Sequence, residues 1–394
     1  MVSKKMYDRG NTSSAIREAF EFGKKRASVI GSENVFDFSI GNPNVPAPKE
    51  LDEAIKSVLD TQETTITHGY TSAAGDVQTR HAIAEFLNKT HGTSFNENNF
   101  YMTSGAAASL TITFNALVEE DDEIIVFAPF FAEYTVFIEK AGAKVVEARC
   151  REEDFQIDLE AFEKAITKHT KAIVLNSPNN PTGVVINEKT IIALCDILNK
   201  KSKEFSTEIF IVSDEPYREL VYDDVTVPFL TKYYNNTIVC YSYSKSLSLP
   251  GERIGYILVP DEICDFDLVF KAICGSGRSL GYVCASSLFQ FAIPKVLGLT
   301  SDISIYKKNR DILIEALSSF GFHIVKPDGA FYLFMKAPDK SAEAFCEMAK
   351  KYEILLVPSD SFGFEGYARI SYCVSTQMVE KSLSAFEKLA KEYF

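Results

Sequence analysis

At residues 237–256 the chain reads TIVCYSYSKSLSLPGERIGY. The apolar run at its start predicts a buried strand, which ends in serines and is followed by Lys245 and, eight residues later, by Arg253. A lysine at the mouth of a sheet can act as an amine nucleophile and form a Schiff base with an aldehyde. Ser242, Ser244 and Arg253 provide the hydroxyl donors and the planar cation that a phosphate group requires. The stretch therefore predicts a site for an aldehyde that also carries a phosphate.

Two other apolar runs end in comparable polar groups. Residues 171–175 lead into NSPNNPTG, which contains Asn180, and residues 208–212 lead into SDEPY, which contains Asp214 and Tyr217. In open α/β sheets, ligands bind at the edge formed by the carboxyl ends of the strands. We therefore expect the three strand ends to contribute to one site.

Pyridoxal 5′-phosphate (PLP) is an aldehyde with a phosphate group, and it would use all of these side chains. Its pyridine nitrogen needs a carboxylate partner to stay protonated, and Asp214 fits that role. Tyr217 and Asn180 can both donate hydrogen bonds to the phenolate oxygen of the ring. Taken alone, Lys245 could be a solvated lysine after an edge strand, and Asp214 could be a helix cap. Together the three strand ends favour the cofactor.

The arrangement of helical and strand patterns predicts an α/β fold. A chain of 394 residues suits two domains, and the alternation from about residue 50 to 290 is typical of a mostly parallel sheet with helices on both faces. Ser13 or Ser14 is expected to cap an N-terminal helix that ends at Gly31. The last hundred residues predict an α+β part. Its expected elements are helices near 306–317 and 342–351, strands near 325, 331–334, 354–357 and 368–374, and a terminal helix.

The composition argues against several classes of protein. The net charge of −13 disfavours a nucleic-acid partner, and no apolar stretch approaches the roughly 18 residues of a membrane span. The N-terminus has no apolar signal core. The eight cysteines are scattered and never in C-x-x-C spacing, which favours a reducing cytoplasm, and the five histidines form no motif that would predict a metal site.

From about Phe38 to Arg369, the sequence resembles the fold-type I PLP-dependent aminotransferases of class I and II, the group that includes aspartate aminotransferase. The resemblance rests on Asn-Pro-Thr-Gly from Asn180, on the Asp214 and Tyr217 pair, and on Ser-x-Ser-Lys followed by Gly-x-Arg-x-Gly. It implies a large domain at 49–292 with a seven-stranded type of sheet. It also implies a small domain built from 1–48 and 293–394.

The resemblance also implies roles for residues outside these motifs. Ser104, Gly105, Ala106 and Ala107 begin a predicted helix behind a strand, where free amide groups would bind the cofactor phosphate, although an ordinary serine cap is also compatible. Phe131 would stack on the pyridine ring, whereas core packing is the competing interpretation for its neighbour Phe130. Tyr70 matches the tyrosine that reaches the phosphate of the neighbouring subunit, which implies a homodimer; by itself it is a loop tyrosine.

Two arginines are candidates for substrate binding. Arg369 lies in a strand-like run, where burial without an anion is unfavourable, and the matching family residue binds the substrate α-carboxylate with help from Asn180 and the backbone at Gly41. The alternative is a structural ion pair on an edge strand. Arg278 falls where aspartate-accepting relatives place an arginine from the partner subunit, and otherwise it would be a surface arginine on a loop.

These features predict an aminotransferase that works by a ping-pong scheme. Lys245 would hold PLP and then act as general base, and Asp214 would keep the ring protonated. Aspartate is the first candidate for the amino donor and 2-oxoglutarate for the acceptor, with an aromatic amino acid or alanine as alternative donors. A C–S β-lyase would use the same PLP-binding residues. A PLP-sensing transcription factor would need a DNA-binding module, for which the acidic chain offers little room.

Overall fold

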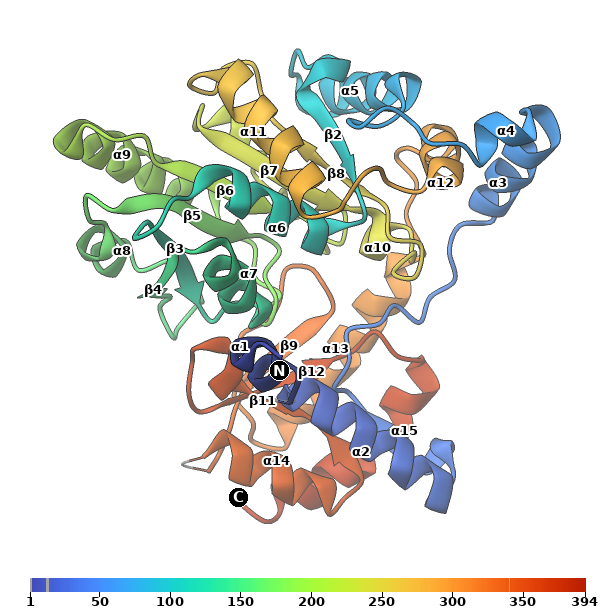
Figure 1. Cartoon of the computed structure of the whole chain (residues 1–394). Coiled ribbons are helices and arrows are strands. Elements are labelled where there is room, and N and C mark those ends of the chain that lie inside the picture. Colours follow the sequence, from blue (N-terminus) through green and yellow to red (C-terminus); the bar gives the residue numbers. More distant parts are fainter. Residues whose placement is uncertain (1, 12–13, 340) are drawn as a thin grey trace.

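The computed structural model describes residues 2–11, 14–339 and 341–394, and it confirms the α/β class (Figure 1). A seven-stranded sheet forms its larger part. In sheet order the strands are β2 (Phe100–Thr103), β8 (Gly255–Leu258), β7 (Thr237–Ser242), β6 (Phe210–Asp214), β5 (Thr170–Asn176), β3 (Glu123–Ala128) and β4 (Lys144–Arg149). Strand β8 runs antiparallel to both of its neighbours, and the other pairs are parallel. The sheet is thus mostly parallel, as predicted.

Helices cover both faces of this sheet because alternate side chains of each strand point to opposite sides. Ile124 and Val126 of β3 pack with α6, α7 and α11, whereas Ile125 and Phe127 pack with α8 and α9. Further along the sheet, α5 covers β2 and β8. The helices are α3 (Lys49–Thr61), α4 (Thr64–Thr67), α5 (Val77–His91), α6 (Ala106–Leu117), α7 (Glu133–Ala141), α8 (Leu159–Ala165), α9 (Glu188–Phe205), α10 (Tyr243–Ser246), α11 (Phe266–Ser279) and α12 (Ser287–Ala292).

A smaller α+β part contains both termini (Figure 1). It has an antiparallel sheet in the order β11 (Val357–Pro358), β12 (Tyr367–Ser371), β9 (Tyr332–Lys336), and a parallel pair of β1 (Phe36–Asp37) with β10 (Ile354–Leu355). Its helices are α1 (Lys4–Asn11), α2 (Ala15–Ile30), α13 (Ile303–Ser319), α14 (Ala342–Lys350) and α15 (Thr376–Ala390).

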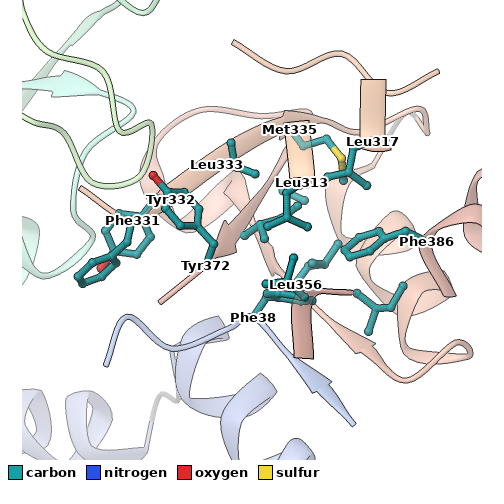
Figure 2. Close-up of a cluster of buried hydrophobic side chains, with 14 of the residues drawn as sticks. Phe38, Leu313, Leu317, Phe331, Tyr332, Leu333, Met335, Leu356, Tyr372 and Phe386 are labelled. Atoms are coloured by element: carbon teal, nitrogen blue, oxygen red, sulfur yellow. The ribbon is translucent and has the colours of Figure 1, made fainter. Parts of the chain in front are cut away.

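The N-terminal segment packs into the core of this smaller part. Phe38 lies among Leu313, Leu333 and Phe386 in Figure 2, although it comes from the other end of the chain. We therefore propose that residues 1–48 and 293–394 form one domain and residues 49–292 the other. The β1–β10 pair and the place of Phe38 support this division.

Most predicted elements of the smaller part are present, with two differences. Ser14 caps α2 and Gly31 ends it, as predicted, while Ser13 lies outside the described residues. The strand expected near residue 325 is wrong, because only an isolated bridge between Ile324 and Met335 forms there. The run 354–357 is divided between β10 and β11, which belong to different sheets. Pairing partners far along the chain decide both cases, and local sequence does not contain that information.

None of the helices in the described part of the chain combines the length and the apolar character needed to span a membrane.

Candidate active site

The carboxyl ends of β5, β6 and β7 meet at one level of the sheet. Asn176 is paired with Asp214, and Asp214 with Cys240, so the residues that follow these strands face a common cavity of about 300 Å³. Most of the predicted site residues line this cavity: Gly41, Ala106, Ala107, Phe131, Asn180, Asp214, Tyr217, Ser242, Ser244, Lys245, Arg253 and Arg369. The tertiary structure therefore brings residues from seven separate segments to one place.

Lys245 lies on the short helix α10, directly after β7. The side chain of Ser242 caps this helix by accepting a hydrogen bond from the Ser244 amide. The Lys245 ammonium donates to the carbonyl oxygen of Gly41 over 2.7 Å. Burial lowers the pKa of Lys245 to about 8, with a smaller contribution from the positive charges of Arg253 and Arg369. A buried amine with this pKa is partly neutral near pH 8, and the neutral form is the nucleophile.

Asp214 ends β6 with one carboxylate oxygen paired and the other free. Its Oδ2 accepts a hydrogen bond of 2.6 Å from the hydroxyl of Tyr134, whereas its Oδ1 is buried without a partner. Burial raises the pKa of Asp214 to about 7, against the opposing effect of the Tyr134 bond. An unsatisfied buried carboxylate oxygen is unfavourable, and it would be satisfied by a protonated ring nitrogen in the cavity. The free Oδ1 therefore fits the predicted cofactor.

Another group of lining residues offers donors for an anion. Helix α6 begins at Ala106, and its first turn has no side-chain cap, so its amide groups are free to bind a ligand. Gly105 has φ +87°, and a Cβ atom there would lie 2.7 Å from Nη2 of Arg253. Glycine is thus required for Arg253 to approach the start of the helix. Arg253 also donates to Ser244 Oγ over 3.3 Å.

Arg369 is fully buried in β12 and lines the cavity. Its guanidinium donates to Asn180 Oδ1 over 3.1 Å and to the carbonyl oxygen of Ser39 over 2.5 Å. Its Nε is buried without a partner, and burial lowers its pKa. Because these acceptors are neutral oxygens, the guanidinium is suited to receive a carboxylate from a ligand.

Four predicted residues do not line the cavity of this protomer. Ser104 and Gly105 lie just before α6, next to the lining residues. Tyr70 is 90 % exposed, and Arg278 is exposed in the last turn of α11. The alternative that Arg278 is a surface arginine on a loop is wrong as to the loop, because the Gly-Ser-Gly sequence before it continues the helix. The roles of Tyr70 and Arg278 toward a neighbouring subunit stay predictions.

Sequence reasoning missed several residues that complete the site. Tyr134 pairs with Asp214, Tyr332 lines the cavity beside Arg369, and Ile16 and Phe137 form part of the wall. Asn176 holds the Asn180 amide with its side-chain oxygen over 2.8 Å. Asn176 could have been found, because it opens the strand-end motif. The other four lie on helices or strands with no local pattern that distinguishes them from core residues.

Comparison with known proteins establishes the family. The family model for aminotransferase class I and II matches residues 33–386. The chain therefore belongs to the class I and II aminotransferases. It is a transaminase, as predicted from the sequence.

Individual relatives agree with this assignment. The chain is 32% identical to an aspartate aminotransferase of Pyrococcus horikoshii, covering 95% of this chain and 94% of the relative. It is 28% identical to aromatic-amino-acid aminotransferase 2 of Thermococcus litoralis, covering 96% of each. The solved structure of an amino transferase from Eubacterium rectale is 57% identical with a TM-score of 0.98, covering 100% of this chain and 99% of that one. The solved structure of aspartate aminotransferase from Thermus thermophilus with maleate has a TM-score of 0.86 at 27% identity, covering 99% of this chain and 100% of that one.

Proposed function

We propose that the cavity binds PLP and that the enzyme transfers the amino group of an L-amino acid to a 2-oxo acid by a ping-pong scheme. One observation carries this proposal. The same cavity is lined by Asp214, whose Oδ1 has no partner, and by Lys245, whose amine is partly neutral. Bound PLP supplies an electron sink for negative charge at the substrate Cα. The side chains of the protein carry out the binding and the proton transfer.

Different lining residues would bind different groups of the cofactor. Asp214 would accept a hydrogen bond from the ring nitrogen and keep it protonated. Arg253, Ser242 and Ser244 would bind the phosphate together with the amides of Ala106 and Ala107, and Ser104 and Gly105 shape the start of the helix that presents these amides. Phe131 would stack on the ring, and Tyr217 and Asn180 would donate to its phenolate oxygen.

Lys245 and Arg369 act on the substrate. Arg369 binds the α-carboxylate through its planar fork, and Asn180 and the Gly41 segment complete the contact. This contact orients the substrate so that its Cα hydrogen faces Lys245. The neutral amine of Lys245 takes that proton from Cα and would deliver it to the C4′ carbon of bound PLP, and with the 2-oxo acid it would move a proton in the opposite direction, to Cα. The low pKa of Lys245 favours both steps, since the amine can release its proton again near neutral pH.

The walls of the cavity bear on the choice of amino donor. The lining side chains that have no role above include Ile16, Ile40, Leu110 and Phe137, all apolar. A second carboxylate beside them would lose hydration without gaining a partner. Aspartate would therefore depend on Arg278 of the partner subunit. The apolar wall favours the alternative donors, an aromatic amino acid or alanine.

We also propose a cytoplasmic homodimer. Tyr70 is almost fully exposed, which suits a residue that acts in the cavity of a neighbouring subunit. The eight cysteines are all free thiols, in keeping with a reducing compartment.

A panel of amino donors tests the activity. The purified enzyme with PLP is expected to convert aromatic or aliphatic donors and 2-oxoglutarate to the corresponding 2-oxo acids and glutamate. Pyruvate serves as a second acceptor. Release of pyruvate and ammonia from a cysteine conjugate, without amino transfer, would favour the β-lyase instead. Failure of every donor in a protein that binds PLP would exclude the proposed reaction.

A further inference from the structure

Tyr332 touches several functional groups of the site, although no motif marks it. It lies at the start of β9, is 2 % exposed and lines the cavity. Its hydroxyl lies 2.9 Å from the hydroxyl of Tyr217, and its ring centroid lies 4.8 Å from the Arg369 guanidinium carbon. Tyr332 thus contacts a proposed cofactor ligand and the proposed carboxylate ligand at the same time.

The same hydroxyl also borders the segment that holds Lys245. A Cβ atom on Gly41 would overlap the Tyr332 hydroxyl oxygen, so the Gly41 backbone lies directly against it. The carbonyl oxygen of Gly41 in turn accepts the hydrogen bond from Lys245. The Tyr332 side chain therefore contacts three functional elements: Tyr217 and Gly41 through its hydroxyl, and Arg369 through its ring.

The two tyrosines are held together by their neighbours along the chain. Residues 220–222 pair with residues 328–330: the Ala330 amide donates to the Leu220 carbonyl over 2.8 Å, and the Tyr222 amide to the Asp328 carbonyl over 2.9 Å. These segments lie three residues after Tyr217 and two residues before Tyr332. The distance between the two hydroxyls is therefore determined by backbone pairing close to both.

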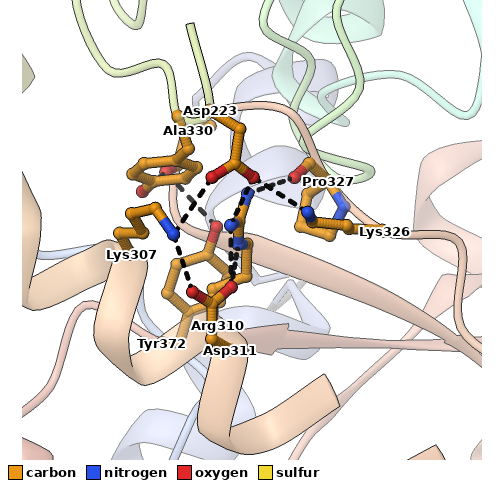
Figure 3. A network of polar contacts seen from close by, with 9 residues as sticks. Asp223, Lys307, Arg310, Asp311, Lys326, Pro327, Ala330 and Tyr372 are labelled. Carbon is orange, nitrogen blue, oxygen red and sulfur yellow. Dashed lines mark hydrogen bonds and ion pairs between the residues drawn. The ribbon is translucent and has the colours of Figure 1, made fainter. Parts of the chain in front are cut away.

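A network of charges fixes the same junction (Figure 3). Asp223 binds Lys307, Arg310 and Lys326 at 3.0, 2.7 and 2.8 Å. Arg310 is 1 % exposed and also donates to the Pro327 carbonyl over 3.0 Å. Because α13 and the 326–330 segment are both bound to Asp223, the Tyr217 loop and the Tyr332 strand are joined as one unit.

The chemistry of two adjacent phenols restricts their hydrogen atoms. Each phenol has one hydrogen to donate and can also accept. If Tyr217 donates to a ligand in the cavity, the bond between the tyrosines requires Tyr332 to donate to Tyr217. Burial raises the pKa of Tyr332 to about 12, so Tyr332 retains this hydrogen at neutral pH.

We propose that Tyr332 is a positioning residue: its hydroxyl donates to the Tyr217 oxygen and so directs the Tyr217 hydrogen at the phenolate oxygen of the cofactor, while its ring orients the Arg369 guanidinium. This inference rests on the proposed function. The Tyr332 side chain thus has two separate roles: its hydroxyl acts on the cofactor through Tyr217, and its ring acts on the substrate carboxylate through Arg369.

Two substitutions separate these roles. Tyr332→Phe removes the hydroxyl and keeps the ring, and Tyr332→Leu removes both. Tyr234→Phe is a matched control, because Tyr234 is a buried tyrosine whose hydroxyl donates to the Ile209 carbonyl over 2.8 Å and which does not line the cavity. Three quantities are measured: the pKa at which the visible absorbance of the PLP-loaded enzyme titrates, the Kd of the apo-protein for PLP, and the KM for the amino donor.

Tyr332→Phe is expected to raise the pKa of the visible titration. A weaker hydrogen bond from Tyr217 leaves more negative charge on the phenolate oxygen, which holds the neighbouring proton more tightly. The Kd for PLP is expected to rise about three- to tenfold, with KM unchanged. In a Tyr217→Phe background, Tyr332→Phe should cause no further pKa shift. Tyr332→Leu is expected also to raise KM, about three- to thirtyfold, because the guanidinium loses the ring face.

Three results would overturn the inference: a Tyr332→Phe enzyme that titrates like the wild type, an undiminished shift in the Tyr217→Phe background, or the same shift in Tyr234→Phe. If the proposed function itself were wrong, the wild-type protein would give a different result from the one above. In that case the wild-type protein itself would lack PLP binding and a visible titration.

Discussion

The ammonium of Lys245 donates a hydrogen bond of 2.7 Å to the carbonyl oxygen of Gly41, 204 positions earlier in the chain. The acceptor is neutral, so it stabilises the position of the ammonium without fully compensating its buried charge. Burial and the two nearby arginines lower the pKa to about 8. The fold thus holds the amine in place and leaves it ready to lose a proton.

Replacing this amine tests its covalent role. The Lys245→Ala enzyme is expected to lose the visible absorbance of the wild type with PLP and to have no measurable amino transfer. Borohydride reduction of the wild-type enzyme should attach the cofactor to the peptide that contains Lys245, as mass spectrometry can show. An unchanged visible spectrum in the Lys245→Ala enzyme would refute the assignment of this lysine.

Asp214→Asn is expected to stabilise the apo-protein while abolishing activity. In the folded protein the pKa of Asp214 is raised from 3.8 to about 7, so the folded state keeps a proton that the unfolded chain releases. The contribution of Asp214 to stability is therefore complete below about pH 4 and is lost as the pH rises through 7. Asparagine does not ionise. Its advantage should grow across this window to at most about 4 kcal/mol at pH 8.

Urea unfolding of the two apo-proteins at pH 4 and pH 8 measures this difference. Tyr134 can still donate to the side-chain oxygen of the introduced asparagine, so the main change is the loss of the buried charge. An equal difference in unfolding free energy at both pH values would show that ionisation of Asp214 is not responsible.

Arg369→Ala is expected to raise KM for every amino donor by roughly 10- to 100-fold, because a charge-assisted hydrogen-bonding fork is lost. Arg369→Lys should give an intermediate KM, since lysine keeps the charge without the planar fork. Steady-state kinetics with several donors check both variants. An increase limited to one donor would assign Arg369 to the substrate side chain instead of the shared α-carboxylate.

A substitution at Arg278 tests whether aspartate is the preferred amino donor. This side chain does not line the cavity of its own chain, and part of the cavity wall is apolar. We expect Arg278→Ala to change kcat/KM for aspartate and for leucine by the same factor. A selective loss for aspartate would show that the partner subunit's Arg278 binds a second carboxylate, and aspartate would again be the first candidate.

Gly41→Ala is expected to reduce activity, because its methyl group would overlap the Tyr332 hydroxyl and displace the carbonyl that holds Lys245. Tyr332→Phe in the same chain frees part of that space. The double variant should therefore regain part of the kcat lost in Gly41→Ala, as steady-state kinetics would show. No recovery would mean that the added methyl acts through another contact.

Much of the site could be predicted because its residues follow apolar runs directly. Asn180, Asp214 and Lys245 each come after a buried strand, and parallel strands deliver their carboxyl ends to one edge. Arg369 was recognisable as a cation in a strand-like run. The place of these residues in the fold depends on the strand beside them in the chain, so a short stretch of sequence is enough to predict it.

The amino-acid order by itself determined the class of fold, the mostly parallel sheet and the three strand ends that face one cavity. Only the tertiary structure decided that Tyr134 binds Asp214, that Tyr332 contacts both Tyr217 and Arg369, and that Gly41 receives Lys245. The physical reason is that these contacts join elements that are far apart in the chain. Which side chains meet there depends on how helices and sheets pack, and no local pattern records that packing.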